Sequence, residues 1–167
     1  MGTASVADII HEVKMITDYD NFIEEAIELL DNAKESVYIA ANKFDARVME
    51  ASFRVINREL KFFYIANQEQ GFSESIQALR TIFLQSEMVK LVRTLINSRE
   101  LNIRLTKEHL SHSFVVIDGE LGVIELPHPA FNDFYVAFKF KNISFCQKLL
   151  DTFNSIYEKG KVDPRIS

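Results

Sequence analysis

Two short segments with apolar side chains on both faces constrain the fold most: SVYIAAN, residues 36–42, and ELKFFYIAN, residues 59–67. Both are rich in β-branched and aromatic residues, which is typical of a strand that is covered on its two faces. An amphipathic helix is predicted before the first strand, in residues 18–36, and a second helix between the strands, in residues 44–57. Helices that alternate with doubly buried strands predict an α/β fold.

The first of these helices has a clear beginning and a clear apolar stripe. Asp18 or Asp20 can cap its start, and Glu24 and Glu25 favour its first turn. The apolar residues that repeat at helical spacing are Ile23, Ala26, Ile27, Leu30 and Ala33. We therefore expect this helix to pack on a sheet.

The second half of the chain predicts a meander followed by a helix. ELNIRLT, residues 100–106, reads as a short strand, and FVVID, GVIEL and FYVAFKF follow as three more. Asp118-Gly119 is a preferred pair for a tight hairpin turn between the first two of these three strands. In NISFCQKLLDTFNSIYEKG, Ser144 can cap a helix and Gly160 can end it. The side chains of this helix that are predicted to face the core are Phe145, Leu149, Phe153 and Ile156.

The complete order of elements predicts a mixed β-sheet with helices on both faces. Residues 6–16 are short and amphipathic, which predicts an N-terminal helical segment over residues 1–17. The α/β domain is expected over residues 18–158, with a loose tail at residues 159–167. Residues 74–98 are predicted to form one long helix or two, with an apolar stripe wide enough for a core helix or a subunit interface. A homodimer is therefore expected.

Composition excludes several classes of protein. The net charge of −5 argues against a surface that mainly grips nucleic-acid phosphates, so DNA would be contacted only through a local patch or another domain. No apolar run reaches the roughly 20 residues that a membrane span needs, and no secretory signal is recognisable. A single cysteine, Cys146, excludes an internal disulfide and fits a reducing, cytoplasmic setting.

One stretch carries a recognisable motif: SHSFVVIDGELGVIELPH, residues 111–128. Together with NAKESVYIAANKFDA, residues 32–46, and the closing strand and helix, it resembles one half of the phospholipase D-like fold. The signature of that family is His-x-Lys, four apolar residues, Asp-Gly, and a later Gly-x-x-Asn. The resemblance covers roughly residues 18–158.

The resemblance implies a role for five positions, of which four have changed. The nucleophilic histidine of the family falls on Ser111 and its phosphate-binding lysine on Ser113. The aspartate falls on Asp118 and is kept, although Asp-Gly also suits the turn alone. The later glycine falls on Glu125 and the asparagine on His128.

These changes remove the groups that phosphoryl transfer needs. A serine at position 111 has no adjacent base to activate it, and a serine at position 113 carries no positive charge. Glu125 adds negative charge where a phosphate would lie. We therefore expect no catalytic residues of the family's kind, and we expect His112, one residue out of register, to point to the opposite face of the strand.

The resemblance implies a non-catalytic module of the kind found in archaeal transcription regulators of the TrmB type, where such a domain senses a ligand or holds a dimer. The predicted ligand pocket is lined by Ser111, Ser113, Asp118, Glu125 and His128, which can hydrogen-bond a polyol or another small polar ligand. One alternative is a phosphodiesterase or nuclease whose rearranged active site forms across a homodimer interface. Another is a protein-interaction or scaffold domain whose pocket is vestigial, which the sequence does not separate from a ligand sensor.

Two further clusters have a functional and a plain interpretation. Glu108, His109 and His112 lack the spacing of a zinc protease, which favours surface histidines over a metal site, and no cofactor is expected. Arg47, Arg54 and Arg58, with Lys43 and Lys61 at the ends of the helix, form either an anion-binding patch or a solvated helix face.

Overall fold

The computed structural model describes residues 13–43, 45–67, 102–131 and 133–162. Within these ranges the chain forms one eight-stranded sheet with the strand order β1-β7-β6-β5-β2-β3-β4-β8. The strands are β1 (Val13–Ile16), β2 (Ser36–Ala41), β3 (Lys61–Asn67), β4 (Asn102–Thr106), β5 (Phe114–Ile117), β6 (Leu121–Pro127), β7 (Phe134–Lys141) and β8 (Lys161–Val162).

The sheet is mixed, as the sequence predicts. Strands β2, β3 and β4 are parallel to one another, whereas β5, β6 and β7 form an antiparallel meander that joins the sheet through the β2–β5 pair. A helical crossover therefore connects β2 to β3, whereas hairpin connections join β5, β6 and β7.

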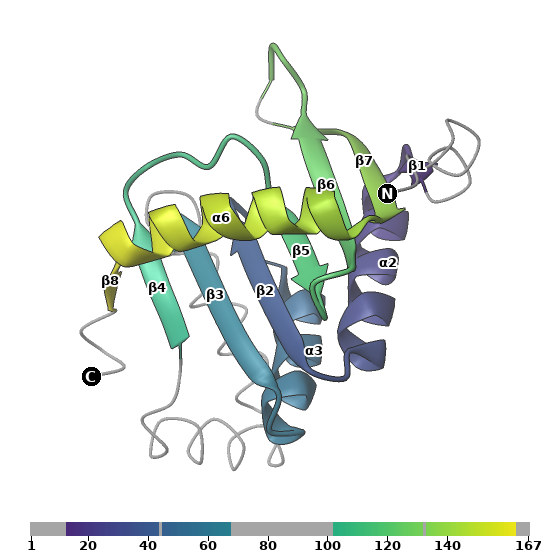
Figure 1. Ribbon diagram of the computed structural model, residues 1–167. Coiled ribbons are helices and arrows are strands. Elements are labelled where there is room, and N and C mark those ends of the chain that lie inside the picture. Colours follow the sequence, from purple (N-terminus) through teal and green to yellow (C-terminus); the bar gives the residue numbers. More distant parts are fainter. Residues whose placement is uncertain (1–12, 44, 68–101, 132, 163–167) are drawn as a thin grey trace, which may run out of the picture.

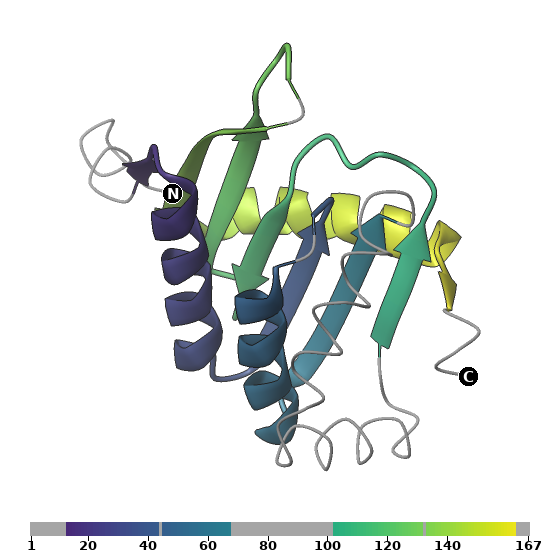
Figure 2. The same ribbon diagram turned by 180° about the vertical axis from the view of Figure 1, so that it is seen from behind.

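Helices cover both faces of the sheet (Figures 1 and 2). Helices α2 (Tyr19–Asn32) and α3 (Ala46–Asn57) lie side by side on one face, and α6 (Ile143–Lys159) crosses the other face. Asp18 caps α2 by accepting a hydrogen bond from the Asn21 amide at 3.0 Å. Each face has its own apolar core, the first centred on Leu30 and Val37 and the second on Phe153 and Ile65.

The helix α6 departs from the prediction at its start. Its N-cap is Asn142, whose Oδ1 accepts a hydrogen bond from the Phe145 amide at 2.8 Å, and not Ser144. Cys146 is buried on the face of α6 that packs on the sheet, whereas Phe145, which was predicted to face the core, is exposed. The predicted end at Gly160 and the buried positions Leu149 and Phe153 are confirmed.

The predicted N-terminal helix is wrong for the residues that are described. Val13–Ile16 form strand β1, which pairs antiparallel with β7 in the register Val13↔Phe140. Lys14 is ion-paired to Glu25 of α2, and Ile16 is buried beneath the same helix, so β1 belongs to the α/β domain. Val13 and Met15 lie two residues apart on the same face of this strand, and both are exposed. Residues 6–12 lie outside the described residues.

The predicted loose tail is also partly wrong. Helix α6 runs to Lys159, and Lys161–Val162 form β8, which pairs antiparallel with β4 and closes that edge of the sheet. The helix predicted in residues 74–98 and residues 163–167 lie outside the described part of the chain. Among the described residues, no helix is long and apolar enough to cross a membrane.

Candidate functional site

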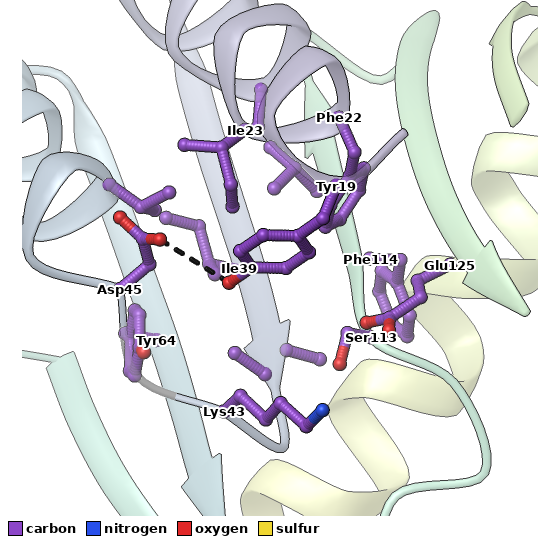
Figure 3. Close-up of a pocket in the computed structure, with 15 residues that line it drawn as sticks. Tyr19, Phe22, Ile23, Ile39, Lys43, Asp45, Tyr64, Ser113, Phe114 and Glu125 are labelled. Atoms are coloured by element: carbon purple, nitrogen blue, oxygen red, sulfur yellow. Dashed lines mark hydrogen bonds between the residues drawn. The ribbon is translucent and has the colours of Figure 1, made fainter. Parts of the chain in front are cut away.

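A pocket opens where the carboxyl end of β2 meets the starts of α2 and α3, beside β5 and β6 (Figure 3). Its volume is about 40 Å³, room for about three water molecules when one needs roughly 10–15 Å³. We call it the inner pocket. Its polar lining residues are Tyr19, Lys43, Asp45, Tyr64, Ser113 and Glu125, and its apolar lining residues are Phe22, Ile23, Ala26, Ile39, Ala40, Ala41, Val48, Phe114 and Val115.

A second, more polar hollow shares three residues with the first. It has a volume of about 20 Å³ and is called the outer pocket. Its lining residues are Asn42, Lys43, His109, Ser113, Glu125, Pro127 and Asp133. Lys43, Ser113 and Glu125 therefore lie where the apolar interior meets the polar mouth.

Ser113 and Glu125 form the buried polar centre of this site. The Glu125 amide donates a 2.8 Å hydrogen bond to the Ser113 carbonyl just beyond the β5–β6 ladder, which places the two side chains together. The Ser113 Oγ accepts a hydrogen bond from the Asn42 amide at 3.2 Å and donates one to the Glu125 carboxylate. Glu125 is only 7% exposed. Burial raises the pKa of Glu125, although the Ser113 hydrogen bond and the charge of Lys43 act in the opposite direction.

Asn42 holds the loop before β5 against the end of β2. Its side-chain nitrogen donates to the Leu110 carbonyl, and its Oδ1 accepts from the Leu110 amide at 2.9 Å. This pair of hydrogen bonds fixes where the loop enters β5, and so it fixes Ser113 at the pocket. An asparagine at the carboxyl end of a strand thus positions the loop that carries the motif.

Tyr19 and Asp45 form a second polar pair across the pocket. The Tyr19 hydroxyl donates to Asp45 Oδ2 at 3.3 Å, as Figure 3 shows. Asp45 also caps α3 by accepting from the Arg47 amide at 2.9 Å, and it pairs with the Arg47 guanidinium. Burial alone would raise the pKa of Asp45, but the hydrogen bonds from Arg47 hold it below its usual value. Burial and the nearby carboxylate raise the pKa of Tyr19.

The five predicted site residues are not all brought together. Ser113 and Glu125 line both pockets, but Ser111 is exposed and lines neither. His128 lies in the loop after β6, where its Nδ1 accepts hydrogen bonds from the amides of Ala130 and Phe131 at 3.0 and 3.2 Å. In this position His128 shapes the loop and lines neither pocket.

Asp118, the kept motif residue, lies at the opposite end of β2 from the pocket. Its carboxylate accepts hydrogen bonds from the amides of Lys34, Glu35 and Ser36 at 2.8–3.2 Å. Asp118 and Gly119 have φ values of 52° and 68°, so the predicted tight turn is confirmed. These hydrogen bonds tie the turn to the start of β2.

Sequence reasoning missed Tyr19, Asp45 and Tyr64 as lining residues, and it assigned Lys43 only to a basic patch. One signal was available, because ligands in open α/β sheets bind beyond the carboxyl ends of the strands, and Lys43 and Asp45 follow β2 directly. Tyr19 and Tyr64 offered no such signal, because packing alone brings them to the pocket.

The predicted basic patch on α3 is engaged within the protein. Arg54 pairs with Asp31 at 3.0 Å, and Arg58 donates to the carbonyls of Asp31 and Ala33 at the end of α2. Arg47 pairs with Asp20 of α2 at 2.9 Å, so these contacts together join α3 to α2. As for a metal site, the described residues contain no group of three or more His, Cys, Asp or Glu side chains that could hold an ion.

The mixed sheet with helices on both faces is a phospholipase D-like fold, as comparison with solved structures shows. Among solved structures, it is similar to TrmBL2, an archaeal chromatin protein, with a TM-score of 0.64, 16% identity, and coverage of 91% of this chain and 54% of that one. It is also similar to NucT from Helicobacter pylori, with a TM-score of 0.60, 15% identity, and coverage of 89% and 97%.

A third similar structure is Nuc from Salmonella typhimurium, a phospholipase D family member, with a TM-score of 0.59, 12% identity, and coverage of 89% of this chain and 95% of that one. The chain thus spans nearly all of the two Nuc-type structures but about half of TrmBL2. No protein-family model and no curated protein matches the chain.

Proposed function

We propose that the chain is a non-catalytic phospholipase D-like module that binds a small polar ligand and serves as the sensing or dimerising part of a transcription regulator. The observation that carries this proposal is the pocket itself. The motif position of the phosphate-binding lysine holds Ser113, the position of the nucleophilic histidine holds an exposed Ser111, and a buried carboxylate, Glu125, lies between the two hollows.

The electrostatics of the pocket favour a ligand other than a phosphodiester. Glu125 and Asp45 both line the inner pocket, and Asp133 lines the mouth, so carboxylates outnumber the single lysine among its lining residues. An anionic phosphate would meet these carboxylates at close range in a partly desolvated site. Hydroxyl and carboxylate groups, by contrast, can exchange hydrogen bonds with a small polar ligand.

The regulatory part of the proposal rests on similarity. TrmBL2 is a chromatin protein with a described mode of DNA binding, and this chain corresponds to about half of it. With a net charge of −5, the chain is a poor candidate for gripping DNA by itself. We propose that any DNA contact is made through another domain or partner, that the module forms a homodimer, and that it works in the cytoplasm.

Ligand binding is tested by thermal unfolding against a panel of small polyols, sugars, hydroxy acids and amino acids. A ligand at 100 times its Kd adds about 2.7 kcal/mol, which should raise Tm by roughly 5–10 °C. Glu125→Gln should lose most of this increase. As a matched control, Glu158→Gln, an exposed change on α6, should keep it. A panel that leaves Tm unchanged throughout would contradict a ligand-binding role.

One observation favours a phosphodiesterase as the second candidate. His109 and Lys43 line the same outer pocket, so a histidine and a lysine do converge there from positions outside the motif. Lys43 lies 4.0 Å from the Asp133 carboxylate, however, and its charge also acts on Glu125. Two carboxylates around the lysine weaken its attraction for a phosphate, which is why we place this candidate second.

A further inference from the structure

Two side chains of opposite charge, Glu125 and Lys43, lie at the junction of the inner and outer pockets. Glu125 enters from β6, and Lys43 enters from the segment after β2. Figure 3 shows the Lys43 ammonium extending toward the side of the pocket that holds Ser113 and Glu125. One oxygen of Glu125 can be satisfied by the Ser113 hydroxyl, which leaves the carboxylate with further acceptor capacity.

Glu125 is unusually buried for a glutamate side chain. Glutamate side chains are almost never fully buried unless they are paired, because the charged form loses its hydration. The partners of Glu125 within the described residues are the Ser113 hydroxyl and the longer-range charge of Lys43. A cationic group bound beside Glu125 would supply the close partner that a buried carboxylate favours.

Beyond this charged junction, the inner pocket is apolar and small. Ile23, Ile39 and Val48 are among its walls, and its volume of about 40 Å³ has room for only a few heavy atoms. A long or branched apolar chain does not fit this volume, but a hydrogen, a methyl or a hydroxymethyl group does. The site therefore combines two opposite charges with a short apolar recess.

We propose that the pocket binds a small zwitterion, namely an α-amino acid with a short side chain such as alanine or serine. The ammonium of the ligand pairs with Glu125, and its carboxylate takes the place of the exposed Asp133 carboxylate, which lies 4.0 Å from the Lys43 ammonium. The side chain of the ligand enters the recess between Ile23, Ile39 and Val48. This inference rests on the proposed ligand-binding function and names the chemical class of the ligand.

Isothermal titration with three matched compounds tests the class. L-Alanine carries both charges, L-lactate replaces the ammonium with a hydroxyl, and L-alanine amide removes the carboxylate charge. Loss of one charged partner leaves the other charge partly buried and unpaired, so L-lactate and L-alanine amide should bind at least about 10-fold more weakly than L-alanine. Glycerol serves as the neutral polyol in the same series.

Two variants assign the charges. Glu125→Gln should lower the affinity for L-alanine at least about 10-fold and leave the affinity for L-lactate nearly unchanged. Lys43→Met should lower the affinity for L-alanine and leave the affinity for L-alanine amide nearly unchanged. Lys148→Met and Glu158→Gln, both exposed on α6, are the matched controls and should bind as the unaltered protein does. Circular dichroism of each variant checks that it is folded.

The outcomes separate this inference from the proposed function. Binding of L-alanine with the expected response to both variants supports the zwitterion. Equal or tighter binding of L-lactate, L-alanine amide or glycerol overturns the zwitterion but keeps a ligand-binding module. Binding of none of the four compounds overturns the zwitterion, and the broader thermal panel then decides on the proposed function.

Discussion

Replacing Asp118 by alanine is expected to lower the free energy of unfolding by about 3 kcal/mol. The carboxylate accepts hydrogen bonds from three successive amides, those of Lys34, Glu35 and Ser36, and alanine leaves all three without this partner. Alanine is also less suited than aspartate to the φ of 52° at this position. Urea denaturation followed by circular dichroism measures the change.

Two further variants show whether the loss of stability comes from the hydrogen bonds of the Asp118 carboxylate. Asp118→Asn keeps an acceptor oxygen and the tolerance for positive φ, so it should lose only about half as much stability. Asp151→Ala, an exposed change on α6 that removes one hydrogen bond to Gln147, should cost under about 0.5 kcal/mol. If Asp118→Ala left stability intact but abolished ligand binding, the kept aspartate would have a functional role and our structural assignment would be wrong.

Replacing Phe153 by alanine is expected to cost about 4 kcal/mol, the largest stability effect that we predict. Phe153 of α6 is fully buried, and its ring meets Tyr38 edge-on with 5.3 Å between centroids. It also lies 5.7 Å from the ring of Tyr157 and 6.5 Å from that of Phe114. Removing it opens a cavity between α6 and the middle of the sheet, and chemical denaturation measures the loss.

Phe153→Leu is the control, because it keeps most of the buried volume and should cost only about 1–1.5 kcal/mol. The inner pocket is lined by residues of α2 and α3, which lie on the other face of the sheet from α6 (Figures 1 and 2). Phe153→Leu should therefore retain whatever ligand response the protein has. A large loss of stability in Phe153→Leu, or a negligible one in Phe153→Ala, would contradict the packing that we describe for α6.

The sequence predicts the central strands well because the apolar residues of those strands determine their position in the sheet. Strands β2 and β3 are apolar on both faces, and only a sheet covered by helices on two sides buries them. The edge strands are predicted poorly because they form only by pairing with strands that are distant in the sequence. Strand β1 has four residues with a short amphipathic pattern, and its structure depends on β7, which comes much later in the chain.

The start of α6 shows the limit of local rules. Asn142 and Ser144 are both good capping residues and lie two positions apart, so the pattern cannot choose between them. The structure caps the helix with Asn142, directly after the end of β7 at Lys141.

The residues of the candidate site also differ in how well the sequence predicts their positions. The motif register brings Ser113 and Glu125 to the pocket, because the hydrogen bond between the Glu125 amide and the Ser113 carbonyl extends the β5–β6 pairing by one step. Ser111 and His128 lie farther from the paired residues, and neither of them lines the pocket. Tyr19 and Asp45 come from helix starts that only the packing of α2 and α3 brings to the same pocket.

The central claim, that the pocket binds a ligand and does not transfer a phosphoryl group, is tested most directly by hydrolysis of bis-p-nitrophenyl phosphate without added metal. We predict that the protein and its His109→Ala variant both hydrolyse it at the rate of the buffer alone. Turnover by the unaltered protein that falls at least about 100-fold in His109→Ala or Lys43→Met, the loss typical of removing a catalytic group, would contradict the claim.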